Sequence, residues 1–454
     1  MNILKKICYN SNVYPKSKVI NDITCDTFWS NILKCANYYK EIIKKNDIIT
    51  VENTQDEYFL YTLFSLNLLG AIVLPVDNKM PLNLMLETSN KIDARKILKK
   101  EDITNIFGII KDGELKEYSF PSDYDTSLIL LSSGSTGNVK YIEVNYKTIE
   151  NIVKSNKKSF DFSSNSKVLV TGDLSHSYSI MKSMSAIYYC LYLIVFNSKN
   201  IVDFVSLICS KLDNLVICTN PTFLHYLITI FNDDIKKHIS NIQTIITATS
   251  PLSENDAKTV LNLIKNTNIK FFNHYGATEL DNLCYMNISK DGYKFNCVGK
   301  PMLGTYVEIV DENDNKIISS KEKYGRVRVK SNGYSKYYKN LGDEYFYTGD
   351  LGYLENNFLY IVDREKNFFN INGYKISPSQ IENIALSYSY VDECICIYDG
   401  VLILKVVVKP DFSLDKLKEI LYNNLLSYQV PKKIEIVSSI DKNRTGKIDR
   451  KINS

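Results

Sequence analysis

The sequence predicts an α/β protein with a large N-terminal domain of helix-covered sheets, a β-subdomain and a small α+β C-terminal domain. The chain has 454 residues, more than one ordinary hydrophobic core accommodates. Up to Gly299, short β-rich runs alternate with helical patterns, as in parallel sheets covered by helices. The pattern of expected helices and strands then changes near Gly299 and again near Asp363. The expected parts are an N-terminal domain at 1–362, its β-subdomain at about 299–362, a boundary at 363–366 and a C-terminal domain at 367–454.

The elements of the N-terminal domain are expected from the length and periodicity of the apolar runs. Early helices are predicted at 28–45 and 57–70, with strands at 48–51 and 71–76. Further strands are predicted at 126–131, 167–170, 214–218, 242–248 and 269–273. The helices between them are predicted at 146–156, 221–230 and 254–264.

Shorter, closely spaced elements are expected after Gly299. Strands joined by polar turns are predicted at 306–310, 326–330, 353–354 and 358–361. Ser377 and Pro378 predict the start of a helix that runs to about Ser387, because proline suits the first turn. Asp399-Gly400 indicates a type I′ hairpin between strands at 394–398 and 401–409. A helix at 414–425 and a strand at 434–437 complete the C-terminal domain.

Composition excludes several classes of protein. Hydrophobic residues at 44% and charged residues at 23% are typical of a globular enzyme, and a net charge of +4 argues against a nucleic-acid binder. We expect no secretory signal and no membrane span, since the apolar runs at 186–196 and 68–76 are short or interrupted. Ten scattered cysteines and four histidines predict reduced thiols, no zinc site and a cytoplasmic location.

A loop rich in serine, glycine and threonine follows the strand expected at 126–131. Glycines allow close backbone approach, while hydroxyl and amide groups donate to phosphate oxygens. It is not a Walker A loop, because the spacing to Lys140 is wrong and no Ser or Thr follows that lysine. A surface turn has the same composition in many proteins. The loop residues are Ser132, Ser133, Gly134, Ser135, Thr136 and Gly137.

This loop resembles the phosphate-binding loop of the adenylate-forming (AMP-binding, ANL) superfamily, which contains acyl-CoA synthetases, nonribosomal-peptide adenylation domains and luciferases. Further motifs of the superfamily follow in its order, and together they cover nearly the whole chain. The chain is most similar to acyl and aryl acid ligases. The matching segments are Asn273-His274-Tyr275-Gly276-Ala277-Thr278-Glu279, Tyr347-Thr348-Gly349-Asp350, Asp363-Arg364 with Asn372-Gly373-Tyr374-Lys375-Ile376-Ser377-Pro378, and Asn443-Arg444-Thr445-Gly446-Lys447.

For the phosphates, the resemblance implies a site for ATP and Mg²⁺. The loop at 132–137 is expected to hold the β- and γ-phosphates, with Lys140 nearby. Thr278 is expected to bind the α-phosphate, and Glu279 to hold Mg²⁺, which favours a carboxylate together with phosphate oxygens. Without the other motifs, Glu279 would be read as a solvated acid at a helix start.

For the nucleoside, the resemblance implies that Tyr275 packs on the adenine ring, with Gly276 leaving space beside it. Asp350 is expected to accept hydrogen bonds from the ribose, assisted by Arg364. Taken singly, such a tyrosine is more often a core aromatic and such an aspartate a turn residue. The expected ATP/AMP set is completed by Ser250, Asn273 and His274.

In the C-terminal domain, the resemblance implies a mobile lid. Lys447 is expected to be the catalytic lysine of adenylation, stabilising charge that grows in the transition state. A basic solvated tail is the alternative reading of that segment. Lys366 stands at the hinge about which the domain rotates, and Gly373 is expected to line the tunnel for the thiol of CoA or phosphopantetheine.

The chain departs from the family pattern at five positions. Asn370 bears on thioester formation, whereas the adenylation set is complete, so adenylation is the better-supported half-reaction. The departures are Asp363 in place of glycine, Asn370 in place of lysine, Val139 in place of proline, Tyr141 in place of glycine and Arg326 in place of glutamate.

The segment around His176 resembles the histidine-containing segment of acyl and aryl acid ligases. The resemblance implies that His176 is catalytic and lines the acyl pocket with Ser177, and Thr222 and Thr249 are expected in the walls of that pocket. Relatives that activate amino acids carry an aspartate where this chain has Ser177, and that aspartate pairs with the α-ammonium. An unpaired buried ammonium is costly, so Ser177 favours a carboxylic acid without an amino group. Asp173 is an alternative source of that negative charge.

The predicted function is an ATP-dependent carboxylic acid ligase. It forms an acyl-adenylate and pyrophosphate, and then an acyl thioester on CoA or on the phosphopantetheine of an acyl or peptidyl carrier protein. One alternative is a free-standing amino-acid adenylation enzyme that loads a peptidyl carrier protein. A second is a catalytically silent nucleotide-binding interaction protein, and a luciferase-like oxidoreductase is disfavoured because no feature requires O₂ chemistry.

Overall fold

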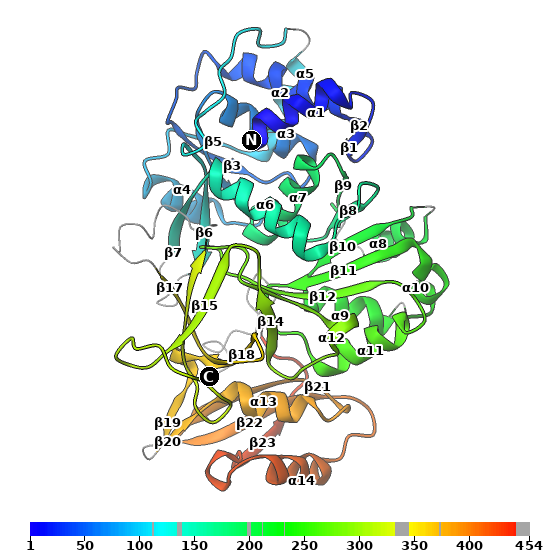
Figure 1. The fold of residues 1–454 in the computed structure, drawn as a ribbon, viewed down its shortest axis with the longest axis vertical. Helices are drawn as coiled ribbons and strands as arrows, with labels where there is room; N and C mark the ends of the chain where they lie inside the picture. The colour runs from blue at the N-terminus through cyan, green and yellow to red at the C-terminus, as the bar shows by residue number, and fades with distance from the viewer. Residues whose placement is uncertain are drawn as a thin grey trace.

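A computed structural model describes residues 1–110, 113–133, 139–197, 201–210, 212–230, 232–331, 345–371 and 374–441. The predicted fold class is confirmed: a large N-terminal part built on helix-covered sheets is followed by a smaller α+β part. The molecule is elongated, with the N-terminal helices at one end and the C-terminal sheet at the other (Figure 1).

The first sheet has five strands in the order β5-β3-β4-β6-β7. All neighbouring pairs are parallel except β6 and β7, which are antiparallel. Helix α3 (Glu57–Leu68) begins where Asp56 accepts a hydrogen bond from the Tyr58 N–H, and it is buried over nearly its whole length. The strands are β3 (Ile48–Glu52), β4 (Ile72–Val76), β5 (Lys96–Leu98), β6 (Thr126–Ser133) and β7 (Val139–Asn145).

The second sheet has thirteen strands, in the order β15-β16-β17-β18-β14-β13-β12-β11-β10-β8-β9-β1-β2. Its parallel part supplies the edge on which the site is built. That part consists of β8 (Lys167–Val170), β9 (Tyr192–Val195), β10 (Leu215–Thr219), β11 (Ile242–Ala248) and β12 (Lys270–Tyr275). The remaining strands of the N-terminal part are β1 (Lys18–Ile20), β2 (Ile23–Thr24), β13 (Cys284–Asn287), β14 (Cys297–Pro301), β15 (Thr305–Val310), β16 (Gly325–Ser331), β17 (Phe346–Glu355) and β18 (Phe358–Arg364).

Helices separate and cover the two sheets. Figure 1 shows α6 (Tyr146–Phe160) and α7 (Ser177–Tyr188) between the sheets, and both contribute to the largest hydrophobic core. A second core lies on the opposite face of the thirteen-stranded sheet. The other helices of this part are α1 (Ile3–Val13), α2 (Cys25–Tyr39), α4 (Leu82–Asn90), α5 (Lys100–Ile109), α8 (Ile201–Cys209), α9 (Pro221–Ile230), α10 (Asn232–His238), α11 (Glu254–Ile264) and α12 (Ile288–Asp291).

Strand β14 joins the antiparallel strands near the C-terminal part to the parallel ones. It pairs with β13 on one side and with β18 on the other. The strands of the expected β-subdomain are therefore hydrogen-bonded into the same sheet as β8 to β12, rather than forming a sheet of their own.

The C-terminal part has its own core and a three-stranded sheet. Its helix α13 (Pro378–Leu386) starts as expected, with Ser377 accepting from the Gln380 N–H. The hairpin at Asp399-Gly400 forms, but the type I′ prediction is wrong: only Gly400 of the two has positive φ, at 65°, and type I′ needs both. The other elements are β19 (Phe369–Ile371), β20 (Tyr374–Ile376), β21 (Val391–Asp399), β22 (Val401–Val408), α14 (Leu414–Asn424) and β23 (Lys433–Ile436).

Across the ranges that the structure describes, every helix is too short or too polar to cross a bilayer.

Candidate active site

The segments expected to bind ligands leave the carboxyl ends of neighbouring parallel strands. In the pairing register, Val170 of β8 lies beside Cys218 of β10, and Thr219 of β10 beside Thr247 of β11. Ala248 of β11 lies beside His274 of β12. In open α/β sheets, ligands bind outside the carboxyl ends of the strands. The loops after β8, β10, β11 and β12 therefore meet at an edge suited to binding.

Three residues expected at the nucleoside come together although they are distant in sequence. The hydroxyl of Tyr275 donates to Oδ2 of Asp350, and Nε of Arg364 donates to Oδ1 of the same carboxylate at 3.1 Å. Asp350 is buried, while about half of the Arg364 side chain is exposed. Burial, reinforced by the Asp350 charge, raises the pKa of Tyr275 well above its usual value. The arrangement fixes the orientation of a carboxylate at the end of β12.

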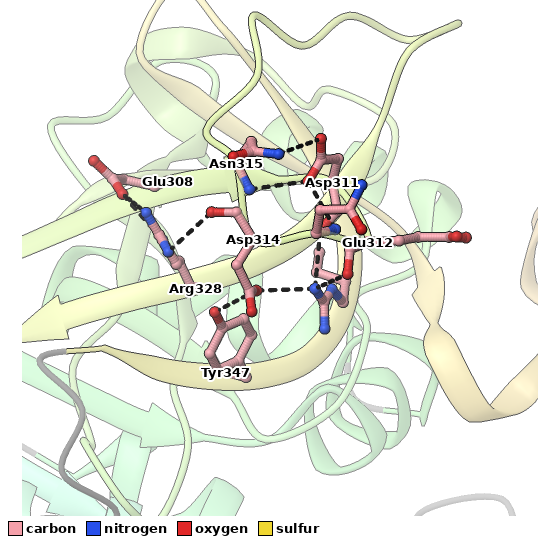
Figure 2. Close-up of polar contacts among 9 residues, drawn as sticks. Glu308, Asp311, Glu312, Asp314, Asn315, Arg328 and Tyr347 are labelled. Carbon is pink, nitrogen blue, oxygen red and sulfur yellow. Dashed lines mark hydrogen bonds and ion pairs between the residues drawn. The ribbon is translucent and has the colours of Figure 1, made fainter.

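A polar cluster at the start of β17 anchors the strand that carries Asp350 (Figure 2). The hydroxyl of Tyr347 donates to Oδ1 of Asp314 at 2.6 Å, and Arg326 donates to that oxygen at 2.9 Å. Arg328 donates from Nε and Nη2 to Oε2 of Glu308, at 3.0 and 2.8 Å. Arg326, a departure from the family pattern, thus has a structural role in holding the turn at 311–315.

On the phosphate side, Ser132 at the end of β6 donates to Oε1 of Glu279 at 3.3 Å. Two sheets therefore contribute to the same place, since Glu279 follows β12. Lys140, on β7, and Thr278, which directly precedes Glu279, are both half-buried. The side chain of Ser133 and the expected phosphate residues Gly134, Ser135, Thr136 and Gly137 lie outside the described residues.

Two backbone features mark the edge of this site. A side-chain atom added at Gly276 would lie 1.9 Å from the carbonyl oxygen of Asp281, so only glycine fits there. Thr249, just after β11, has a φ of 79°, which is strained for a β-branched residue. Strain of this kind is concentrated at functional sites. Both features lie among the residues expected to bind ligand.

The residues expected in the acyl pocket differ in burial and in their contacts. Ser177, the first residue of α7, donates to Oδ1 of Asp281 at 3.0 Å. His176 is exposed at the N-terminus of that helix, and Thr222 is half-buried in the first turn of α9. Oδ1 of Asp173 accepts hydrogen bonds from both the N–H, at 2.8 Å, and the hydroxyl of Ser175. The Asp173 carboxylate is thus already used locally.

Two buried charged residues beside this pocket were missed by the sequence analysis. Lys182 of α7 is fully buried, and Asp281 is nearly so. Burial lowers the pKa of Lys182 to about 8 and raises that of Asp281 to about 6, while each charge partly offsets the effect on the other. One signal pointed to Lys182: it is the only acidic or basic residue, histidine aside, between Asp173 and Lys199.

His274, expected in the ATP/AMP-binding set, lies in this buried region. It is 4% exposed, and its ring packs against Phe160 and Tyr178 at centroid distances of 5.4 and 5.8 Å. Burial, with the nearby Lys182 charge, holds the pKa of His274 well below its usual value. The imidazole is therefore neutral, and the rings that it contacts belong to α6 and α7.

The junction between the N- and C-terminal parts is organised by one carboxylate. Asp363, at the end of β18, accepts from the side chain of Ser377, from the Ser379 N–H at 3.1 Å and from Asn367 at 3.0 Å. This departure from the family glycine thus ties β18 to the start of α13. Lys366 is exposed in the short turn that follows β18. The side chain of Asn370 and all of Gly373 and Lys447 lie outside the described residues.

A second set of contacts joins the C-terminal part to helices α9 and α11. His225 lies 2.8 Å from Asp256 and 3.7 Å from Asp392, a residue of β21. Lys409 approaches the same Asp392 at 3.5 Å. Asn255 donates to the carbonyl of Leu386 at 3.1 Å.

Metal ligands are sparse in the described part of the chain, where no three His, Cys, Asp or Glu side chains are grouped to hold an ion. Glu279 is buried and linked to Ser132, and it stands as a single carboxylate. A protein site of this kind suits Mg²⁺ only when phosphate oxygens and water supply the other ligands.

Two family descriptions match the chain. The family described as AMP-binding enzyme matches residues 10–339, and the AMP-binding enzyme C-terminal domain matches residues 380–447.

Among curated proteins, the chain is similar to CoA ligases. It is 23% identical to the 2-succinylbenzoate–CoA ligase of Listeria monocytogenes over 428 residues, which cover 90% of this chain and 88% of the relative. It is 24% identical to the corresponding ligase of Lactococcus lactis, over 99% of both chains.

Among solved structures, ATP-bound MatB from Rhodopseudomonas palustris superposes with a TM-score of 0.87 at 16% identity, covering 100% of this chain and 98% of that one. MenE from Bacillus subtilis, in complex with the acyl-adenylate OSB-AMP, gives a TM-score of 0.84 at 18% identity and covers 98% and 97% of the two chains. These likenesses establish the common fold.

Proposed function

The chain belongs to the family of AMP-binding enzymes, and on that premise we propose how its residues carry out the reaction. It is an ATP-dependent acid–thiol ligase that works through an acyl-adenylate, as its similarity to CoA ligases indicates. The observation that carries the residue assignments is the convergence of Tyr275 and Arg364 on the Asp350 carboxylate, beside the contact between Ser132 and Glu279.

In the first step, the oxygen of a substrate carboxylate attacks the α-phosphorus of ATP. A carbon–oxygen–phosphorus linkage forms, and pyrophosphate leaves. Both reactants are anions, so catalysis comes mainly from positioning and charge neutralisation. We assign adenine packing to Tyr275 and ribose binding to Asp350, whose orientation is already fixed by its two donors. We assign the α-phosphate to Thr278 and the growing charge to Lys447.

Mg²⁺ binding is proposed for Glu279. The carboxylate is buried at the meeting point of the two sheets, and the hydroxyl of Ser132 lies 3.3 Å from its Oε1. Glu279 would hold the ion as a single protein ligand, and the ion would supply charge neutralisation for the triphosphate. The phosphate loop at 132–137 and Lys140 are proposed to bind the remaining phosphate oxygens.

In the second step, a thiol attacks the acyl carbon and AMP leaves. CoA is the acceptor in the relatives named above, and we propose it for this chain, with a carrier-protein phosphopantetheine as the second candidate. We propose a carboxylic acid without an α-amino group as substrate, because Ser177 offers no charge of its own and Asp173 is engaged by Ser175. A cytoplasmic location is supported by ten cysteines that are all free thiols.

Exchange of radiolabelled pyrophosphate into ATP tests the first step. We expect exchange that depends on an added carboxylic acid, screened over fatty, aromatic, hydroxy and amino acids. ATP binding without exchange for any acid would contradict the proposal. Exchange restricted to α-amino acids would instead support an amino-acid adenylation enzyme.

Lys447→Ala separates the two steps. We expect adenylation to fall on the order of 10²-fold or more, because the lysine stabilises charge in the transition state. Thioester formation from supplied acyl-adenylate should be retained. Equal losses in both steps would show that Lys447 has another role.

A further inference from the structure

A buried polar cluster lies directly behind the first turn of α7. We define it by six residues whose side chains are half-buried or buried: Asn156, Ser177, Lys182, His274, Asp281 and Asn282. Lysine and aspartate are seldom so completely buried, and they are retained inside proteins when a partner or a function requires them. The reaction described above uses neither Lys182 nor Asp281.

The cluster is held together by hydrogen bonds and ring contacts. Lys182 donates to Oδ1 of Asn156 at 2.6 Å, and its ammonium lies 4.5 Å from the ring centre of Phe160 and 5.3 Å from that of Tyr178. Tyr178 is fixed in turn by its hydroxyl, which donates to the carbonyl of Ile246 at 3.0 Å. Rigid positioning of the ammonium is characteristic of a binding site rather than a solvated side chain.

Several polar atoms of the cluster have no hydrogen-bond partner. Oδ2 of Asp281 is a buried acceptor without a donor. The ring of His274 lies toward the Asn282 side chain and the Asp281 backbone, but neither its nitrogens nor Oδ1 of Asn282 completes a hydrogen bond of good geometry. A buried polar atom left unpaired costs about 1–3 kcal/mol. Three adjacent side chains in this state indicate that a ligand completes the hydrogen bonding.

The position of the cluster connects it to the substrate. Ser177, expected in the acyl pocket, donates to Asp281 at 3.0 Å. The carbonyl of Asp281 packs against Gly276, which follows Tyr275 of the nucleoside site. The cluster is therefore continuous with the place where a carboxylate would meet ATP.

We propose that this buried polar cluster is the inner wall of the acyl subsite and selects carboxylic acids that carry a hydroxyl group. The inference rests on the proposed function. A hydroxyl donates one hydrogen bond, which Oδ2 of Asp281 or Oδ1 of Asn282 can accept, and it accepts from the remaining donors of the Lys182 ammonium. An alkyl chain would leave those atoms unpaired.

Charge distinguishes a hydroxyl from an ammonium at this position. Lys182 and Asp281 carry opposite charges and compensate each other inside the protein. An added ammonium would leave the cluster with a net positive charge, which is costly to bury. A neutral donor leaves the balance unchanged, so hydroxy acids are favoured over amino acids as well as over plain acids.

Matched acids test the proposal on the wild-type protein. The pyrophosphate exchange assay is run on propanoate, 2-hydroxypropanoate and alanine, on butanoate and 3-hydroxybutanoate, and on benzoate with its hydroxy and amino derivatives. We expect the hydroxy member of at least one series to exceed both partners by at least about tenfold in kcat/KM. Equal or greater activity with plain or amino acids overturns the inference and leaves the ligase assignment intact. Absence of exchange with every acid removes the ligase assignment itself.

Variants of the buried polar cluster then test whether its side chains determine the preference for hydroxy acids. In Asp281→Asn, and in the charge-free pair Lys182→Met with Asp281→Asn, the ratio of kcat/KM between hydroxy and plain acids should fall at least about tenfold. The ratio is taken on one enzyme preparation, so partial unfolding cancels. Thr244→Val, at another buried and unpartnered hydroxyl on β11, is the control and should keep the wild-type ratio. An unchanged ratio in both cluster variants overturns the inference.

Discussion

Two groups of charged side chains in this molecule differ in how fully they are paired. The group on β15, β16 and β17 is partly exposed, and its carboxylates are paired: Arg328 gives two donors to one oxygen of Glu308, and Tyr347 binds Asp314 (Figure 2). One buried donor of this group, Nε of Arg326, has no partner among the described residues. The buried polar cluster holds Lys182 and Asp281 away from water, yet it leaves acceptor atoms empty.

The difference separates a structural role from a binding role. A partly exposed group whose carboxylates are paired contributes mainly by holding a turn, because water competes for its exposed charges. A buried group with unused acceptors has a cost in the free protein that a ligand removes. Burial by itself is not the criterion, since Asp363 is as buried as Asp281 but fully engaged.

The largest effect is expected for Lys182→Ala. Removing the cation leaves Asp281 buried and uncompensated, so the free energy of unfolding should fall by about 3–5 kcal/mol. Urea denaturation measures it. The control is Arg328→Ala in the half-buried pair with Glu308, where a smaller loss of about 1.5–3 kcal/mol is expected. Similar losses at the two positions would abolish the distinction between the groups.

Asp363→Ala should have the next largest effect. It removes the acceptor shared by Ser377, Asn367 and the Ser379 N–H, and leaves these groups without a partner at the junction. We expect the C-terminal part to lose about 2–3 kcal/mol of stability. Limited proteolysis between the two parts, followed over time, measures this loosening. The ratio of kcat/KM between hydroxy and plain acids should not change in this variant. A change would show that a fully hydrogen-bonded carboxylate such as Asp363 affects substrate choice as the buried polar cluster does.

One substitution at two positions compares the groups directly. Tyr275→Phe removes a buried hydrogen bond to the Asp350 carboxylate and should lower the free energy of unfolding by about 1.5–3 kcal/mol. Tyr347→Phe removes the equivalent bond to exposed Asp314 and should cost under about 1 kcal/mol. Thermal unfolding of both variants measures the difference, and a reversed order would contradict it.

The smallest effect concerns pH. The pKa of His225 is raised above its usual 6.5, first by its hydrogen bond to Asp256 and further by the charges of Asp256 and Asp392, while burial and Lys409 oppose the shift. A histidine with a raised folded-state pKa stabilises fully below the unfolded value and loses that contribution as pH rises through the folded value. Resistance to proteolysis between the two parts should therefore be greater at pH 6 than at pH 8. His225→Gln should remove most of that dependence, and an unaltered pH profile would exclude His225 as its source.

Much of the fold follows from local sequence signals. The strands at 167–170 and 242–248 and the helices at 221–230 and 254–264 were predicted with their observed bounds, because apolar runs of suitable length end at polar residues. The strand expected at 353–354 is longer, Phe346–Glu355, since Gly349 and Gly352 interrupt its pattern. Helix α1 was not predicted, and its buried apolar residues belong to the core that α1 forms with distant segments.

The candidate site was only partly predictable, and the reason is physical. Motifs name residues whose spacing along the chain is fixed, such as Tyr275 and Asp350. The charge interaction of Lys182 with Asp281, ninety-nine positions apart, depends on how α7 packs against the loop after β12. Likewise, the hydrogen bonds that Asp363 accepts from Ser377 and Ser379 form only because the start of α13 lies against the end of β18.

Strand β14 links the strands that carry Asp350 and Arg364 to the strand that carries Tyr275. Because it is hydrogen-bonded to both β13 and β18, the strands bearing Asp350 and Arg364 belong to the same rigid framework as Tyr275. Under the assignments proposed above, rotation of the chain beyond Arg364 would leave the nucleoside contacts of Tyr275 and Asp350 in place. We therefore propose that the acyl-adenylate stays bound, and protected from hydrolysis, while the C-terminal part rotates between the two half-reactions.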